Sequence, residues 1–173
     1  MCLFTFKKGG NMRVAVIMGS TSDLDKVEPA IKVLKDYDVQ VDVRCISAHR
    51  AHKALSAFIE ETNKNGTEVI ITAAGMAAAL PGVVASQTVL PVIGVPLTSN
   101  VLDGVDALFS ICQMPPGIPV ATVAINGSKN AAYLALQILG INHPEIKERL
   151  LEDRKVMEEN ALKANEMVID KYK

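Results

Sequence analysis

Short apolar runs alternate with amphipathic stretches along most of this chain, and this alternation restricts the fold more than any other feature. The apolar runs have the length of buried strands and lie at residues 13–19, 39–47, 68–75, 91–96 and 119–125. Stretches with helical periodicity lie at residues 22–37, 51–66, 80–89, 102–111 and 130–139. Helices that connect parallel strands by right-handed crossovers cover both faces of the sheet. The sequence therefore predicts an α/β protein, a three-layer α/β/α sandwich around a five-stranded parallel sheet.

The length of the chain limits its domain organisation. With 173 residues it can bury one sizeable core, but it is too short for two ordinary domains. We expect an N-terminal extension over residues 1–12, one domain that carries the functional site over residues 13–141, and a C-terminal helix over residues 142–173.

The C-terminal helical pattern is too long to pack entirely on the rest of the chain. Residues 144–172 would span about 43 Å at 1.5 Å per residue, whereas a core of about 130 residues is only about 36 Å across. An apolar stripe runs along this helix: Ile146, Leu150, Met157, Ala161 and Val168. We expect a neighbouring subunit to cover the overhanging part in a homo-oligomer. A solvated, frayed helix is the alternative, since the segment is rich in charge.

Composition argues against several classes of partner. The formal net charge is -1 at pH 7, which provides no basic surface for nucleic acid or an anionic membrane. Residues 69–102 carry no charge, yet glycines and prolines divide them into pieces too short to cross a bilayer. The three cysteines are widely spaced and show no metal-ligand pattern, and the first residues lack the apolar core of a secretory signal. We expect a cytoplasmic protein with no metal site and no membrane segment.

Ligands of parallel α/β sheets bind at the carboxyl ends of the strands. This rule places four segments on one rim: residues 19–23 (GSTSD), 47–50 (SAHR), 73–82 (AAGMAAALPG) and 113–119 (QMPPGIP). In the first segment, Gly19 permits a tight turn, and the hydroxyls of Ser20 and Ser22 lie beside the N–H groups of a helix start. Such an arrangement suits a phosphate, although an ordinary helix cap explains the same residues.

The segment SAHR adds acid–base and anion-binding groups. His49 can take or give a proton near neutral pH, and the guanidinium of Arg50 can hold a phosphate through two parallel hydrogen bonds. Alternatively, His49 caps the following helix and Arg50 is a solvated surface charge. We take His52 as a surface residue. The segment favours proton transfer on a phosphorylated ligand over hydrolysis or metal chemistry, because no Ser-His-Asp or metal-spaced partners accompany it.

The other two segments are less specific. The small side chains of residues 73–82 would let a flat ligand approach the backbone, but their spacing alone favours close packing of a helix against the sheet. Three prolines stiffen residues 113–119, which suits either the wall of a pocket or a tight turn before a strand.

Six segments, in sequence order, resemble the carboxyaminoimidazole ribonucleotide mutase family of purine biosynthesis: VIMGSTSD, SAHR, AAGMAAALPG, PVIGVP, LDGVDALFSICQMPPGIPVATVAI and NAAYLALQIL. The resemblance extends over residues 14–139. It implies a flavodoxin-like fold, an octamer, and an enzyme that uses no metal or organic cofactor. Enzymes of this family move a carboxylate from the exocyclic nitrogen of an aminoimidazole ribonucleotide to a ring carbon. The proposed route is decarboxylation, retention of the carbon dioxide, recarboxylation at the ring carbon and removal of a proton.

The resemblance also implies roles for individual residues. Ser20, Ser22, Asp23 and Arg50 would hold the phosphate and ribose, and His49 would be the catalytic proton-transfer residue. The remaining substrate-binding residues, most of them against the base, would be Ser47, Gly75, Ala77, Ala78 and Leu80.

One position departs from the family pattern. Mutases of this family usually read Ala-Ala-His-Leu-Pro-Gly where this chain has alanine at position 79. The direct-carboxylase branch, which uses free carbon dioxide, also lacks this histidine, but it typically has lysine at the position of Arg50 and Arg-Ser-Asn at residues 76–78. We therefore predict a mutase. The alternatives are direct carboxylation of aminoimidazole ribonucleotide, or a weakly active or inactive nucleotide-binding protein.

A flavodoxin-type electron carrier would share the fold and the phosphate loop. Flavin sites generally enclose the isoalloxazine ring between aromatic side chains, and this chain has no tryptophan and three tyrosines. The composition therefore favours the enzyme over the electron carrier.

Overall fold

Five parallel strands form one sheet, in the order β2-β1-β3-β4-β5, in the computed structural model, which describes residues 12–173. The strands are β1 (Arg13–Met18), β2 (Gln40–Cys45), β3 (Thr67–Ala74), β4 (Val92–Pro96) and β5 (Ala121–Thr122). This order is that of flavodoxin-like proteins, so the predicted fold class is confirmed. Of the predicted N-terminal extension, residues 1–11 lie outside the described range.

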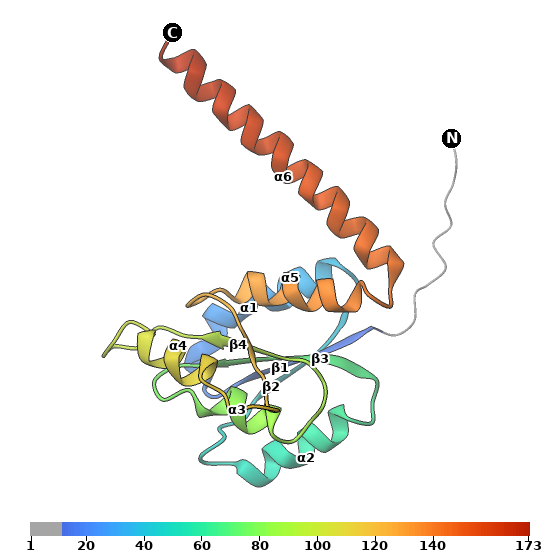
Figure 1. Ribbon diagram of the computed structural model, residues 1–173, viewed down its shortest axis with the longest axis vertical. Coiled ribbons are helices and arrows are strands. Elements are labelled where there is room, and N and C mark those ends of the chain that lie inside the picture. The colour runs from blue at the N-terminus through green and yellow to red at the C-terminus, as the bar shows by residue number, and fades with distance from the viewer. Residues whose placement is uncertain (1–11) are drawn as a thin grey trace.

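Helices cover both faces of the sheet, as predicted. They are α1 (Leu24–Asp36), α2 (His52–Thr62), α3 (Ala79–Ala85), α4 (Val105–Cys112), α5 (Ser128–Leu139) and α6 (Pro144–Lys171), and a short 3-10 helix (Thr21–Asp23) precedes α1. Figure 1 shows α1 and α5 on one side of the sheet and α2 and α3 on the other. None of the helices in the described range is long and apolar enough to cross a membrane.

Alternate residues of the central strand β1 point into two separate cores. Val14 and Val16 belong to a core shared with α1, α5 and the start of α6, whereas Ala15 and Ile17 belong to a core shared with α2, α3 and α4. All four side chains are fully buried. Burial on both faces is the reason why the strand segments read as continuous apolar runs rather than as alternating patterns.

Several element boundaries differ from the sequence prediction, among them the end of α2, which lies at Thr62 rather than residue 66. The edge strand β5 has two residues rather than the seven from 119 to 125, and it starts late because Pro119 has no N–H with which to extend the ladder. Helix α4 begins at Val105 rather than residue 102, because Asp103 and Gly104 have positive φ angles of 50° and 89°. Helix α3 ends at Ala85 rather than residue 89.

Among residues 12–173, helix α6 is anchored to the rest of the protein only near its beginning. Ile146 is buried in the core, and Arg149 stacks over the ring of Tyr37 (4.5 Å to its centroid) while Arg149 Nη1 pairs with Asp38 (2.9 Å). The hydroxyl of Tyr37 also donates to a carboxylate oxygen of Asp153. From residue 154 onward every residue is exposed, and the helix projects away from the sheet (Figure 1). The predicted overhang is therefore present in the single chain.

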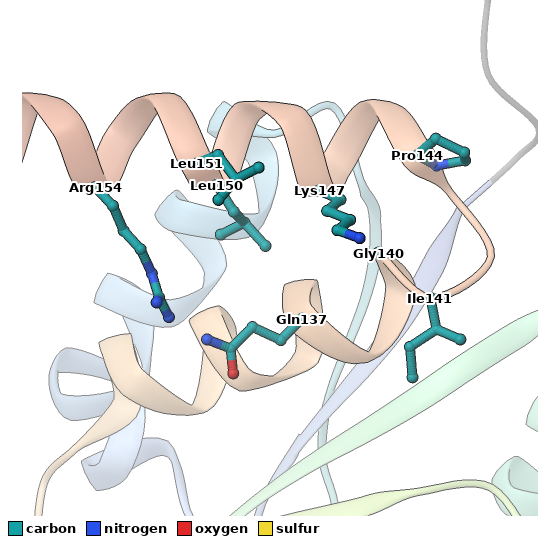
Figure 2. A pocket seen from close by; sticks show the side chains of 8 residues that line it. All are labelled: Gln137, Gly140, Ile141, Pro144, Lys147, Leu150, Leu151 and Arg154. Atoms are coloured by element: carbon teal, nitrogen blue, oxygen red, sulfur yellow. The ribbon is translucent and has the colours of Figure 1, made fainter.

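A groove of about 580 Å³ runs between α5 and the first turns of α6. Figure 2 shows Leu150 and Arg154 directed from α6 toward α5, with Gln137 on the opposite wall. The groove combines apolar side chains with two cations, Lys147 and Arg154.

Candidate active site

The loops that follow β1, β2, β3 and β4 enclose a cavity of about 800 Å³ at the carboxyl end of the sheet. Every site residue predicted from the sequence lines this cavity: Ser20, Ser22, Asp23, Ser47, His49, Arg50, Gly75, Ala77, Ala78 and Leu80. The structure thus brings together residues from three separate segments, as the rule for parallel sheets requires.

The loop after β1 supplies two linked hydroxyl groups. Ser20 has an extended backbone (φ -148°) and occupies the cap position of the 3-10 helix, where its Oγ accepts a hydrogen bond from the N–H of Ser22 (3.3 Å). The hydroxyl of Ser22 donates to the same oxygen (2.8 Å). Ser20 is half-buried and Ser22 is exposed, and both line the cavity, so these residues cap the helix start and also present hydroxyls to a ligand.

Asp23 is the carboxylate of this loop, and it is half-buried. Burial raises the pKa of Asp23 above its ordinary value, because desolvation disfavours the charged form. The ammonium of Lys26 and hydrogen bonds from Ser20 and Ser22 oppose this rise. The Asp23 carboxylate can therefore accept a hydrogen bond from a ligand in the cavity, while burial and the nearby positive charge act on its pKa in opposite directions.

The loop after β2 places an arginine fork beside a histidine. Ser47 Oγ accepts hydrogen bonds from both the backbone N–H and the Nε–H of Arg50, each at 3.3 Å. This contact orients the guanidinium, and within residues 12–173 its two terminal nitrogens make no hydrogen bond to protein. His49 lies on the same turn, exposed to the cavity. His52 is exposed at the first position of α2 and does not line the cavity.

The loop after β3 forms an apolar wall with a constrained backbone. Met76 and Ala78 have positive φ angles of 55° and 35°, a region that costs a non-glycine residue about 1–3 kcal/mol. Ala78 and Leu80 are buried, with 5% and 3% exposure, so this segment both packs against the sheet and lines the cavity. Ala79 is half-buried, lines the cavity and begins α3.

The placement of residues 113–119 on the rim of the active site is wrong, whereas the other interpretation, a tight turn before a strand, agrees with the structure. Gly117, Ile118 and Pro119 line a different cavity, together with Asn63 and Pro91, which precede β3 and β4. The segment leads into β5 and therefore lies at the amino end of the sheet, opposite the candidate active site.

Sequence reasoning missed the fourth wall of the cavity. Thr98, Ser99, Asn100 and Val101 follow β4 and line it, and Lys26 reaches it from α1. The strand-end rule applied to the fourth strand would have indicated residues 98–101. No local pattern indicated Lys26, because its cavity contact depends on a segment 72 residues away.

Comparison with known proteins identifies relatives along most of the chain. The family described as AIR carboxylase matches residues 13–160. An N5-carboxyaminoimidazole ribonucleotide mutase of Pyrococcus abyssi is 54% identical over 150 residues, which are 87% of this chain and 86% of that protein. A protein of the same name from Pyrococcus horikoshii is 51% identical over 163 residues, 92% of each chain.

A solved structure agrees with these sequence relatives. The crystal structure of Treponema denticola PurE superposes with a TM-score of 0.77 at 32% identity, and the match covers 89% of this chain and 94% of that one. Sequence and fold comparisons therefore agree with the resemblance seen in the six segments. The chain belongs to the AIR carboxylase family.

Proposed function

We propose that this protein is an N5-carboxyaminoimidazole ribonucleotide mutase of de novo purine biosynthesis. The observation that carries the proposal is the meeting, in one cavity, of a hydroxyl-rich helix start, a histidine–arginine turn and an apolar wall. The helix start and Arg50 suit a phosphorylated ribose, His49 suits the proton that moves, and the apolar wall suits the flat ring and neutral carbon dioxide. The relatives that are about half identical in sequence carry the same name.

Substrate binding is assigned to the loops after β1 and β2. The terminal nitrogens of Arg50, oriented by Ser47, would donate to phosphate oxygens, and the hydroxyls of Ser20 and Ser22 would add further donors. The carboxylate of Asp23 would accept a hydrogen bond from a ribose hydroxyl. Binding at this end fixes the aminoimidazole ring against the wall at Gly75–Leu80.

The chemical step moves one carboxyl group and one proton. The bond between the exocyclic nitrogen and the carboxyl carbon breaks, carbon dioxide leaves, and the nitrogen takes up a proton. The ring carbon then attacks the retained carbon dioxide, and loss of the proton from that carbon restores the aromatic ring. His49, exposed on the cavity turn, would carry this proton. The wall over residues 76–80 has no polar side chain, which suits retention of an apolar molecule.

Direct carboxylation of aminoimidazole ribonucleotide is the second candidate, and Ala79 is the observation that favours it. An alanine side chain cannot hydrogen-bond the migrating carboxylate, so residue 79 does not stabilise the transition state of the mutase reaction. The two routes are separated by assaying the protein with N5-carboxyaminoimidazole ribonucleotide and, separately, with aminoimidazole ribonucleotide plus bicarbonate. Turnover of the first substrate supports the mutase, turnover of only the second supports the carboxylase, and binding of both without turnover indicates a nucleotide-binding protein.

We further propose that the protein forms a homo-oligomer. The family resemblance suggests an octamer. Residues 142–173 would be the segment of the catalytic domain's chain that holds the subunits together. Support comes from the exposed apolar side chains of α6, among them Met157 and Val168, and from the groove between α5 and α6 (Figure 2). Light scattering at micromolar concentration tests this assignment, and a monomer would refute it.

Free thiols at Cys45 and Cys112 fit the cytoplasmic location expected from the sequence.

A further inference from the structure

The loop after β4 contributes four residues to the cavity, Thr98 to Val101, but few of its own atoms are buried. Thr98 and Ser99 are half-buried, and Asn100 and Val101 are exposed. A wall built from such a segment needs contacts from neighbouring elements to keep one position. The structure provides these contacts almost entirely at Thr98.

Two elements that are distant in sequence hold Thr98. From α1, the Lys26 ammonium donates to the carbonyl oxygen of Thr98 at 2.9 Å. From the turn after β5, Asn126 Oδ1 accepts the N–H of Thr98 at 3.1 Å, and Asn126 Nδ2 donates to Thr98 Oγ1 at 3.2 Å. Both backbone polar groups of Thr98 and its hydroxyl are therefore paired with side chains.

Asn126 is itself fixed in the position that these bonds need. Its φ angle is 56°, in the left-handed region that asparagine tolerates better than most residues, and its N–H donates to the carbonyl of Pro96 at 2.8 Å. Lys26 belongs to none of the ion pairs formed within the described range. Within the described range its hydrogen bond is to the neutral carbonyl of Thr98, and its charge acts on Asp23 without an ion-pair contact.

The position of this loop also affects the wall built by the segment after β3. A Cβ atom added at Gly75 would lie 3.3 Å from the carbonyl oxygen of Leu97 and 3.9 Å from that of Thr98. The two backbones are therefore in close contact. Because the closer contact is with Leu97, a displacement of Thr98 would reach Gly75, and the strained residues Met76 and Ala78 beyond it, through the adjoining Leu97.

We propose that Lys26 and Asn126 are positioning residues, which hold Thr98 so that the loops after β3 and β4 form one fixed wall beside the reacting ring of the ribonucleotide. This proposal rests on the mutase function proposed above. The phosphate end of the substrate, held by Ser20 and Arg50, does not depend on this wall. Loss of either positioning residue therefore misplaces the ring and lowers kcat, while KM changes little.

The test uses the full-length protein with Lys26→Met, which removes the donor but keeps the length of the side chain, and Lys26→Arg, which keeps a donor. The matched control is Lys32→Met, because Lys32 is an exposed lysine of the same helix and does not line the cavity. We expect Lys26→Met to lower kcat by about tenfold to hundredfold, the effect of a misplacement of about 1 Å. KM should stay within threefold, Lys26→Arg should recover most of kcat, and Lys32→Met should match the parent.

A second variant tests whether the two residues act through the same peptide. Asn126→Gly keeps the positive φ angle but removes the side chain that pairs with Thr98. In the double variant that also carries Lys26→Met, the fold-loss of kcat should be smaller than the product of the two single fold-losses. Independent, fully multiplicative effects would contradict a shared target.

Amide hydrogen exchange measures the same attachment without any turnover. In substrate-free protein, Lys26→Met should speed exchange of the Thr98 amide, whose N–H is bonded to Asn126, by about tenfold or more, with no change in the strands. Unchanged exchange overturns the proposal, and so does a rise in KM with kcat unchanged, which would make Lys26 a binding group. If the parent protein turns over neither substrate, the proposed function fails, and the exchange rates alone decide whether Lys26 and Asn126 hold the loop.

Discussion

Replacement of Ala79 by histidine is the perturbation that probes the proposed chemistry most informatively. Ala79 lines the cavity at the first position of α3, next to the buried Ala78 and Leu80. Its own side chain is half-buried, and the cavity of about 800 Å³ is much larger than an imidazole ring. The ring can therefore extend into the cavity without displacing core atoms, which is not true of a substitution at Leu80.

The expected cost to folding is small and the expected gain in rate is large. Histidine is less favourable than alanine in a helix by up to about 0.7 kcal/mol, and position 79 is at a helix end, where the penalty is lower. An imidazole there can hydrogen-bond the migrating carboxylate, which the methyl group of alanine cannot do. One contact of this kind in the transition state is worth about 2.7–4 kcal/mol, or roughly 100-fold to 1000-fold in rate.

The assay compares the parent protein and Ala79→His with both substrates, and the melting temperature of each protein is measured alongside. We expect the variant to convert N5-carboxyaminoimidazole ribonucleotide faster than the parent by up to that factor, with similar KM, because Ser20, Asp23 and Arg50 hold the other end of the molecule. Full mutase activity in the parent and no gain in the variant would refute this view of position 79.

Three further predictions concern the polar side of the cavity. His49→Asn should abolish carboxylate transfer while binding measured by calorimetry persists, and retained turnover would exclude its role in proton transfer. Arg50→Ala should weaken ribonucleotide binding by roughly 1.5–3 kcal/mol, the range for a hydrogen bond to a charged group, and an unchanged dissociation constant would contradict the phosphate contact. Burial raises the pKa of Asp23, so the folded protein binds more protons than the unfolded chain between pH 3.8 and that raised pKa. Denaturant titrations should therefore show the parent losing stability relative to Asp23→Asn as pH rises through this window, and an opposite trend would show that the carboxylate is stabilised rather than penalised by its surroundings.

Much of the fold was predictable because it depends on local patterns. Strand β1 was expected over residues 13–19 and is observed at Arg13–Met18, since burial on both faces requires an unbroken apolar run. The parallel sheet and the covering helices followed from the alternation of the two patterns. The late starts of β5 and α4 depend on Pro119 and on the pair Asp103 and Gly104, whose effect is on the backbone rather than on hydrophobicity.

The candidate site was predictable to the extent that it consists of strand ends. The segments after β1, β2 and β3 were identified because each joins a strand to the next helix within a few residues. The segment at residues 113–119 was misplaced, although it follows the helical pattern of residues 102–111 and precedes the strand pattern of residues 119–125 and therefore belongs at the amino end of the sheet. Lys26 could not be identified, because its contact with Thr98 depends on how α1 lies against the sheet.

Retention of the carboxyl carbon tests the central claim most directly. N5-carboxyaminoimidazole ribonucleotide labelled with carbon-13 in its carboxyl group would be mixed with the protein in an excess of unlabelled bicarbonate, and the product analysed by mass spectrometry. A mutase that holds carbon dioxide between Gly75–Leu80 and Thr98–Val101 passes the labelled carbon to the ring, so we expect the product to keep its label. An unlabelled product would show that the protein carboxylates the ring with carbon dioxide from solution, and would contradict the mutase assignment.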